Sequence, residues 1–269
     1  MDLRIESLSF SYPSGVEALR QVSLSIQSGE SLALVGQNGA GKTTLVKHMN
    51  GLLRPTNGEV WVGDWDTRQH SVAELSSRVG YVFQNPDDQL FQSKVQTEVM
   101  FGPQNLKWPA DQIAQLSKTA LEMVRLTEMA GHHPYDLSPG ERKRVALAAV
   151  LAMDTPVVVL DEPTNGQDYA GVDLVGEIVE WLKGQAKTIL TITHDIDFCA
   201  EHFERVIVMA GGQIVLDGPS REVLAATEEL AVSDVEPPQI MRLARGLGMV
   251  DRPLSVEEFV SALAHETMG

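Results

Sequence analysis

A glycine-rich segment constrains this chain more than any other feature of its sequence. Residues 36–43 read GQNGAGKT and fit the spacing G-x-x-x-x-G-K-[ST]. The segment follows an apolar run at residues 31–35, a predicted strand, and opens a predicted helix at residues 42–50. Glycines let the backbone curl until successive N–H groups point at phosphate oxygens, and the helix presents its positive N-terminus to the same anion. The sequence therefore predicts a strand–loop–helix unit that binds a nucleotide.

The residues of this loop have separate expected roles. Lys42 is expected to reach the β- and γ-phosphates, and the Thr43 hydroxyl is expected to ligate Mg²⁺. The alternative is a glycine-rich turn without a ligand, which the position between a strand and a helix disfavours. The residues expected to bind the nucleotide here are Gly36, Gln37, Asn38, Gly39, Ala40, Gly41, Lys42, Thr43 and Thr44.

Two adjacent carboxylates follow another apolar strand, predicted at residues 157–160. Asp161 and Glu162 stand at its C-terminal end, where open α/β sheets bind ligands. Asp161 suits a contact to Mg²⁺ through water, and Glu162 is placed to polarise an attacking water as a general base. The alternative, a solvated acidic loop, is disfavoured because a phosphate loop requires a metal partner.

Charge and composition exclude several classes of protein. The chain has 269 residues, with 37 acidic and 21 basic side chains and a net charge of −16. So acidic a surface repels phosphate backbones and argues against a nucleic-acid-binding protein. No apolar run reaches the ~20 residues of a membrane span, the N-terminus lacks signal-peptide features, and the one cysteine cannot form an internal disulfide. We therefore expect a soluble, cytosolic chain, which does not prevent docking on a membrane protein.

The order of the predicted elements indicates an α/β fold. Short strands separated by turns in the first third indicate a small antiparallel or mixed sheet. A mainly helical stretch follows, and strands then alternate with helices, as in a parallel sheet with crossover connections. We expect an ATPase-type domain at residues 1–220, a helical subdomain within it at about 86–153, and a helical C-terminal extension at 221–269.

Further motifs resemble those of the ATP-binding cassette (ABC) family of ATPases. The resemblance covers roughly residues 3–220. It implies a P-loop ABC ATPase core with an N-terminal antiparallel β-subdomain, an α-helical subdomain and a helical C-terminal extension. Besides the phosphate loop, the marks in chain order are Tyr12, Gln84 of the Q-loop, Leu137-Ser138-Pro139-Gly140-Glu141 in the place of LSGGQ, Asp161-Glu162 as the Walker B pair, Asn165-Gly166-Gln167-Asp168 as the D-loop, and the switch residue His194.

The resemblance implies ATP and Mg²⁺ as ligands and a role for each mark. Tyr12 is expected to stack on adenine, and Gln84 to sense the metal and the transmembrane partner. Ser138 and Gly140 are expected to bind the γ-phosphate of the ATP that a second subunit holds, across the interface of a head-to-tail dimer. His194 is expected to bind the γ-phosphate and hold the attacking water. The implied catalytic residues are Glu162, His194 and Gln84, and the implied metal ligands are Thr43, Gln84 and Asp161. Structural alternatives are a half-buried tyrosine at a strand end and a structural histidine.

The chain departs from the family pattern at three positions. Pro139 replaces a glycine and removes one backbone N–H, and Glu141 replaces glutamine and adds a negative charge near an arriving phosphate. Gln167 stands where many members of the family carry leucine. This substitution either marks a specialised subunit or is neutral. The basic residues 142–144 are expected to form a solvated helix face rather than a second phosphate site.

A narrower resemblance is to the ATPases of energy-coupling factor (ECF) transporters, which include importers of cobalt, nickel and vitamins. It implies three partners: a second ABC ATPase subunit in a homo- or heterodimer, a transmembrane coupling protein and a substrate-binding membrane subunit. The chain would then be peripheral, on the cytoplasmic face of the cell membrane, with its tail in dimer contacts. The segments that resemble the ECF ATPases are YVFQNPDDQLF at 81–91, TEVMFGP at 97–103, VLAMDTP at 150–156, and the tail with Pro237-Pro238 and Leu243.

The acidic residues after Gln84 have two interpretations. Asp87 and Asp88, with Gln89, either meet arginine-bearing helices of the coupling protein or only stabilise a helix start through its dipole. In the first case Leu90 and Phe91 supply the apolar part of the contact.

The predicted function is an ATP-hydrolysing subunit whose dimer closure powers an ECF-type importer of a metal ion or a vitamin-like micronutrient. A weakly hydrolysing regulatory subunit of a heterodimer is an alternative, motivated by Pro139, Glu141 and Gln167. A non-transport ABC ATPase acting in DNA repair or translation is disfavoured, because the sequence lacks long coiled-coil insertions and basic surfaces.

Overall fold

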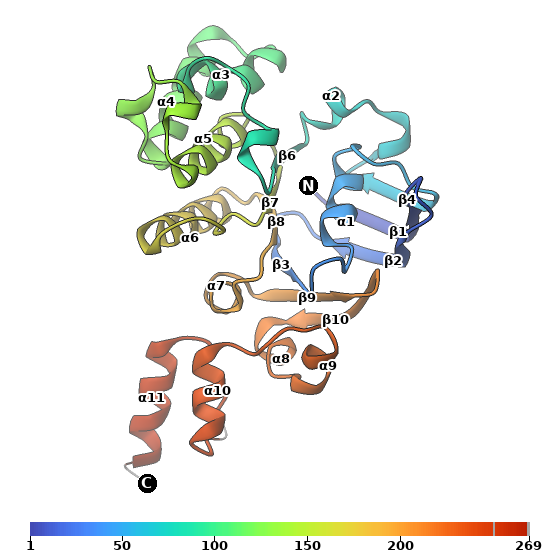
Figure 1. The fold of residues 1–269 in the computed structure, drawn as a ribbon, viewed down its shortest axis with the longest axis vertical. Coiled ribbons are helices and arrows are strands. Elements are labelled where there is room, and N and C mark those ends of the chain that lie inside the picture. Colours follow the sequence, from blue (N-terminus) through green and yellow to red (C-terminus); the bar gives the residue numbers. More distant parts are fainter. Residues whose placement is uncertain (250, 268–269) are drawn as a thin grey trace.

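Two β-sheets form the framework of the molecule. The computed structural model describes residues 1–249 and 251–267. A four-stranded antiparallel sheet has the order β2-β1-β4-β5, and a six-stranded sheet has the order β10-β9-β3-β8-β7-β6 (Figure 1). The first contains β1 (Leu3–Ser11), β2 (Glu17–Ile26), β4 (Asn57–Val62) and β5 (Trp65–Asp66). The second contains β3 (Ser31–Val35), β6 (Val79–Val82), β7 (Val157–Asp161), β8 (Thr188–Ile192), β9 (Arg205–Ala210) and β10 (Gln213–Pro219).

The six-stranded sheet gathers the ends of its parallel strands at one edge. β3 pairs in parallel with β8 and β9, and β7 pairs in parallel with β6 and β8, whereas β10 runs antiparallel to β9. The carboxyl ends of β3, β6, β7 and β8 therefore meet. The phosphate loop, Gln84, the Walker B pair and His194 each end or follow one of these strands, so the topology brings them to one place.

Strand β7 is buried on both faces, which explains its unbroken apolar sequence. Val157 and Val159 pack in a core shared with the four-stranded sheet, whereas Val158 and Leu160 pack in the core on the opposite face. Successive side chains of a strand point to opposite faces, so both sets are apolar when both faces are covered. Asp161 at its end is only 1% exposed, and a carboxylate so placed needs hydrogen-bond partners.

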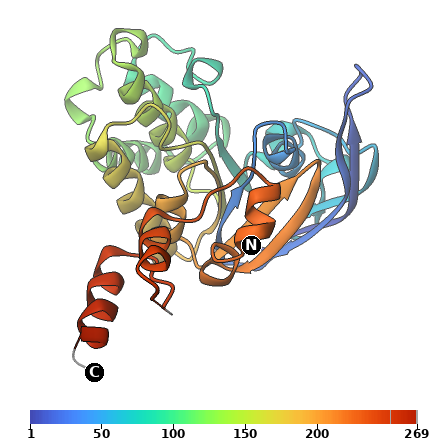
Figure 2. The same ribbon diagram turned by 60° about the horizontal axis from the view of Figure 1, so that its bottom comes forward.

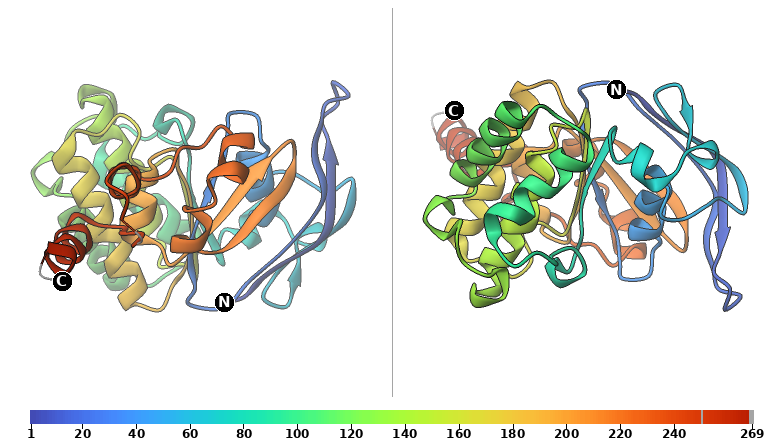
Figure 3. Two further views of the ribbon diagram at one scale, coloured as in Figure 1. Left: turned by 90° about the horizontal axis from the view of Figure 1, so that it is seen from below. Right: turned by 90° about the horizontal axis from the view of Figure 1, so that it is seen from above.

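Helices cover both faces of the six-stranded sheet, and Figure 3 shows one large helical layer beside it. α1 (Lys42–Met49) shares a core with both sheets. The layer on the other face contains α3 (Val95–Asn105), α4 (Ala110–Met123), α5 (Pro139–Leu151), α6 (Tyr169–Gly184) and α7 (Ile196–His202). The shorter elements are α2 (Val72–Leu75), η1 (Thr67–Gln69), η2 (Pro86–Asp88), η3 (Thr127–Met129) and η4 (Pro134–Asp136). Within residues 1–249 and 251–267, none of the helices has both the length and the apolar character needed to cross a membrane.

The C-terminal tail is helical. It contains α8 (Ser220–Val223), α9 (Thr227–Val232), α10 (Gln239–Gly246) and α11 (Val256–Thr267). α8 and α9 lie beside β10, whereas α10 and α11 extend away from the sheets (Figures 1 and 2). Ala244, Met249 and Phe259 form a small core of their own. The tail also reaches the phosphate loop, because the Gln37 N–H donates to the Ser233 carbonyl oxygen at 3.1 Å.

The predicted fold class is confirmed, but the expected solvated face at residues 142–144 is wrong. Lys143 is 4% exposed, and the Arg142 guanidinium pairs with Asp87 at 3.2 Å. Arg144 donates to the carbonyl oxygen of Val124. The reason is that α5 packs against β6 and neighbouring helices, which encloses its first turns.

The expectation that Leu90, together with Phe91, supplies the apolar part of a docking contact is wrong for Leu90. Leu90 is 3% exposed and belongs to the core under the helices, whereas Phe91 is 61% exposed. The backbone between η2 and α3 has no helical structure at these two residues. Leu90 packs into the core under the helices, whereas Phe91 packs edge to face against Phe101 at the surface, so only one of them faces outward.

Candidate functional site

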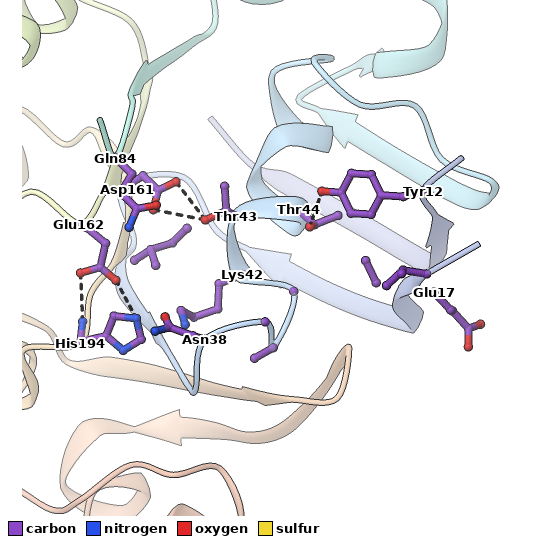
Figure 4. A pocket seen from close by; sticks show the side chains of 16 residues that line it. Tyr12, Glu17, Asn38, Lys42, Thr43, Thr44, Gln84, Asp161, Glu162 and His194 are labelled. Carbon is purple, nitrogen blue, oxygen red and sulfur yellow. Dashed lines mark hydrogen bonds and ion pairs between the residues drawn. The ribbon is translucent and has the colours of Figure 1, made fainter. Parts of the chain in front are cut away.

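A cavity of about 350 Å³ opens at the carboxyl edge of the six-stranded sheet (Figure 4). Its walls come from the β1–β2 turn, the phosphate loop, the first turn of α1 and the ends of the parallel strands. Most of the predicted site residues line it: Tyr12, Asn38, Gly39, Ala40, Gly41, Lys42, Thr43, Thr44, Gln84, Asp161, Glu162 and His194. Val16, Glu17, Ala18 and Ile192 complete the lining and were not predicted from the sequence.

Two glycines of the phosphate loop hold conformations that strain other residues. Gly36 has φ of 140° and Gly41 has φ of 102°. A Cβ atom on Gly36 would lie 2.1 Å from the carbonyl oxygen of Met209, and one on Gly41 would lie 2.7 Å from that of Ala18. The loop therefore curls closely against β9 and β2 because these positions lack a side chain.

The N-terminus of α1 faces the cavity. Gly41 is its N-cap, and no side chain among the described residues caps it. The N–H groups of a first helical turn have no partner within the helix, so they are available to an anion. The Lys42 ammonium donates to the carbonyl oxygens of Gly36 and Gln37 at 2.5 and 3.0 Å. Burial lowers the pKa of Lys42, against the opposing charges of Glu162 and Asp161.

Asp161 accepts hydrogen bonds from two hydroxyl groups. Thr43 donates to Oδ2 at 3.1 Å, and the Tyr81 phenol donates to the same oxygen at 2.7 Å. Gln84 lies beside Asp161 (Figure 4). Hydroxyl, carboxylate and amide oxygens suit Mg²⁺, which keeps several waters and shares substrate phosphates. The Thr43 hydroxyl, the Asp161 carboxylate and the Gln84 amide therefore fit a Mg²⁺ ion whose other ligands are phosphate and water.

Glu162 and His194 contact each other in the cavity. The His194 ring Nε2 lies 3.1 Å from Oε1 of Glu162, and the His194 main-chain N–H donates to Oε2 at 3.2 Å (Figure 4). Glu162 has φ of 50°, in the left-handed region that few residues with side chains adopt. Such backbone strain collects at functional sites. Here it accompanies a carboxylate that faces the ring of the predicted switch histidine.

Burial controls the protonation of this pair. It raises the pKa of the Glu162 carboxyl to about 7, although the His194 N–H and the Lys42 charge favour ionisation. Burial also lowers the pKa of His194, and the Lys42 charge lowers it further. The imidazole is therefore neutral at pH 7. A carboxyl group with a pKa near neutrality is suited to accept a proton at physiological pH.

The raised pKa of Glu162 predicts how stability changes with pH. A carboxyl whose pKa rises on folding from 4.5 to about 7 stabilises the fold fully below 4.5, and this contribution is lost as pH rises through 7. Glu162→Gln should therefore be nearly neutral at pH 5 and stabilising by roughly 1–3 kcal/mol at pH 8. Thermal unfolding of the nucleotide-free protein in EDTA measures this difference. An equal shift in Tm at both pH values would contradict it.

Tyr12 lies at the opposite end of the cavity from Glu162 (Figure 4). Its hydroxyl lies 2.9 Å from Oγ1 of Thr44, and its ring packs edge-on against Phe10 with the centroids 4.9 Å apart. Tyr12 is thus half-buried at a strand end, as the structural alternative expects, and it also lines the cavity, as adenine binding requires. Its stacking on adenine stays a prediction.

Four predicted site residues lie outside this cavity: Gly36, Gln37, Ser138 and Gly140. Ser138 caps α5, because its Oγ accepts the Glu141 main-chain N–H at 3.3 Å. The Ser138 hydroxyl and N–H in turn donate to the Glu141 carboxylate, at 2.6 and 2.9 Å. These bonds lower the pKa of Glu141 and keep it ionised. The expected repulsion of a phosphate by Glu141 stays a prediction.

Gln167 connects the D-loop to the start of α5 within this chain. Its side-chain Nε2 donates to the carbonyl oxygen of Gly140 at 3.1 Å. The glutamine therefore has a structural contact that a leucine side chain does not make.

Sequence reasoning also missed two residues that contact Asp161 without lining the cavity, Tyr81 and Lys143. Lys143 donates to the main-chain carbonyl oxygens of Phe83, Gln84 and Asp161, at 3.1, 2.5 and 3.2 Å. Burial lowers its pKa to about 8. For Tyr81 the signal was a phenol group in an otherwise apolar buried strand, because such a group needs a hydrogen-bond partner. Lys143 stands between Arg142 and Arg144, and no local signal distinguishes it from them.

Several known proteins are similar to this chain in sequence. Residues 19–165 match the family described as ABC transporter. A protein of Methanosarcina acetivorans, provisionally named an ABC transporter ATP-binding protein, is 44% identical over 96% of this chain. The chain spans only 43% of that relative's length. The energy-coupling factor transporter ATP-binding protein EcfA of Methanothermobacter thermautotrophicus is 37% identical over 98% of this chain and 86% of its own.

Solved structures share the fold. CbiO1 from Clostridium perfringens, part of the ABC transporter complex CbiONQ, has a TM-score of 0.76 and 32% identity. The match covers 92% of this chain and 98% of that one. An ATP-binding cassette solved as a dimer in a post-hydrolysis state with ADP and Pi has a TM-score of 0.75 and 26% identity, over 81% of this chain and 98% of its own.

Proposed function

Because this chain belongs to the ABC transporter family of ATP-binding domains, we propose that it hydrolyses ATP to power an ECF-type importer of a metal ion or a vitamin-like micronutrient. The observation that carries this proposal is the meeting of an uncapped helix N-terminus, Lys42, Asp161 and Glu162 at one cavity. The names of the EcfA relative and of CbiO1 support the ECF type. In this proposal the chain is a peripheral subunit on the cytoplasmic face of the membrane.

Binding of ATP uses the phosphate loop. The first-turn N–H groups of α1 hold the triphosphate, and Lys42 exchanges its contacts with the Gly36 and Gln37 carbonyl groups for phosphate oxygens. Tyr12 offers its ring to adenine. Thr43, Asp161 and Gln84 would hold a Mg²⁺ ion, whose positive charge would offset the negative charge of the triphosphate.

Hydrolysis uses the pair at the ends of β7 and β8. Glu162 accepts the proton of the attacking water, which its raised pKa favours. The two contacts from His194 fix the carboxylate, and each carboxylate oxygen retains a lone pair for the water.

A second ABC subunit completes the site in this proposal. Ser138 and Gly140 lie outside the chain's own cavity, at the N-terminus of α5. A segment so placed can serve the nucleotide of a partner, which supports a head-to-tail dimer whose closure follows ATP binding. The exposed Leu243 of α10 is a candidate for further dimer contacts through the tail.

An apolar groove of about 200 Å³ is the proposed docking site for the transmembrane coupling protein. Phe91 and Phe101 line it and pack edge to face with the ring centroids 4.7 Å apart. The buried Glu98 carboxylate accepts the N–H groups of Phe91 and Gln92 at 2.8 and 2.6 Å, which holds this segment in place. Other apolar residues of its wall include Leu52, Val72, Phe83 and Met153.

The docking proposal predicts the effect of Phe91→Ser. Because an exposed aromatic anchor carries much of the energy of an interface, this change should lower the recovery of the membrane partners with the tagged chain by about tenfold. Quantitative mass spectrometry of the purified assembly measures the recovery, and it also identifies the bound small molecule. Val215→Ser, at a 42% exposed position of β10, is the control. Equal recovery with both variants would contradict the groove as docking site.

A second candidate function is a weakly hydrolysing regulatory subunit. The observation that favours it is the ionised Glu141 in the capping box of α5, beside Ser138 and Pro139. This candidate predicts slow turnover by the isolated chain and fast turnover with a different ABC subunit. Dimer formation with ATP and full turnover by the purified chain alone would eliminate it.

A further inference from the structure

Asp161 is fixed from two directions by side chains to which the sequence analysis assigned no role in the site. Tyr81, on β6, donates to its carboxylate, and Lys143, on α5, donates to its main-chain carbonyl group. We propose that Tyr81 and Lys143 are positioning residues that preorganise Asp161 and Gln84 for Mg²⁺. The inference rests on the proposed function as an ATPase.

Tyr81 holds the carboxylate in one orientation. β6 and β7 pair in parallel, with Tyr81 opposite Val159, so the ring is carried toward the end of β7. The ring is 7% exposed and packs edge-on against Phe83 with the centroids 4.8 Å apart. Its phenol and the Thr43 hydroxyl donate to the same Oδ2 atom. Oδ1 has only a longer contact of 3.5 Å with the same Thr43 hydroxyl, so it keeps a lone pair for the water shell of a cation.

Lys143 fixes the backbone on the other side. Its ammonium has three protons and three acceptors: the carbonyl groups of Phe83, Gln84 and Asp161. These acceptors belong to the segment after β6 and to the end of β7, whereas the lysine belongs to α5. A buried ammonium with satisfied donors is costly to displace. The bonds therefore tie the Q-loop and the Walker B strand to one another.

The two side chains together set the distance between the proposed metal ligands before the ion arrives. Ligands held by their neighbours lose little freedom on binding, which favours affinity and correct geometry. The same lysine joins this arrangement to α5, the helix that begins beside Ser138 and Gly140.

The first test is Tyr81→Phe, which removes one hydroxyl group and keeps the ring. ATP binding should become tighter as Mg²⁺ is added, and the Mg²⁺ concentration that gives half of this effect should be about tenfold higher for the variant. The reason is that a hydrogen bond to a charged group contributes enough free energy for such a change. Binding of a fluorescent ATP analogue, titrated with Mg²⁺, measures this, and binding in EDTA should stay unchanged. Tyr135→Phe is the matched control, because its hydroxyl donates to the Leu90 carbonyl oxygen at 3.3 Å and its side chain does not line the cavity.

The second test compares Lys143→Met with Lys143→Gln. Methionine keeps most of the stem and removes all donors, so kcat should fall about tenfold or more while KM for ATP stays within about twofold. Glutamine restores N–H donors and should recover part of kcat. Lys118→Met, at a 69% exposed side chain on α4, is the control. Should Lys143→Met fail to fold, the Tyr81→Phe titration and the kinetics of Lys143→Gln test the positioning roles of the two residues.

The outcomes separate this inference from the proposed function. If the wild-type protein binds no ATP, the proposed function fails. If it binds ATP with Mg²⁺ and Tyr81→Phe shows an equal or lower Mg²⁺ requirement, the positioning role of Tyr81 is overturned. If the Lys143 variants change KM and kcat in parallel with the loss of Tm, or Lys143→Gln recovers nothing, Lys143 is structural only.

Discussion

Glu162→Gln is expected to lower the rate of ATP hydrolysis by about 100- to 10,000-fold, the contribution of a positioned general base. The amide keeps the shape of the carboxyl group but cannot accept the proton of the attacking water. ATP binding should persist, because the phosphate contacts belong to α1 and Lys42. The variant should therefore accumulate as an ATP-loaded closed dimer. Single-turnover kinetics and gel filtration with and without ATP measure the two effects.

The control for this prediction is the same change at an exposed position. Glu177 pairs with Arg125 at 2.7 Å on the surface of α6, and its side chain is 60% exposed. Glu177→Gln should leave turnover unchanged. Rapid hydrolysis by the Glu162→Gln protein would refute the assignment of the base.

Lys42→Ala is expected to weaken ATP binding by about 100-fold or more, because each hydrogen bond between charged groups contributes about 1.5–3 kcal/mol. In the nucleotide-free chain the ammonium binds the Gly36 and Gln37 carbonyl groups. The protein should still fold, since these carbonyl oxygens can turn to water in the open cavity. Isothermal titration with ATP and Mg²⁺ measures the loss.

Lys47→Ala provides the matched control for the lysine variant. Lys47 lies in the last turn of the same helix, outside the residues that line the cavity. Its replacement should change ATP affinity by less than about threefold, as for a distant surface charge. Equal losses from both changes would mean that net charge, and not the Lys42 contact, holds the nucleotide.

Most of the fold followed from local patterns. The apolar run before Asp161 was predicted as a buried strand, and the structure has β7 there with both faces covered. Alternation of strands and helices predicted a parallel sheet, and parallel strands end at one edge. For this reason residues as distant in sequence as Lys42 and His194 were expected to meet, and both line the cavity.

The wrong expectations concern burial that depends on distant neighbours. Lys143 lies 60 residues from Phe83 in the sequence, and only the packing of α5 on β6 makes its ammonium a buried donor. Leu90 and Phe91 are both apolar, and the sequence contains no rule that buries the first and exposes the second.

By itself, the sequence determined the phosphate loop and the acidic strand end, because glycine freedom, helix N-termini and strand periodicity are properties of neighbouring residues. The tertiary structure alone decided what surrounds Asp161, since its partner Tyr81 lies 80 residues away along the chain. Hydrogen-bond partners and burial arise when separate surfaces pack together. No local pattern encodes which surfaces those are.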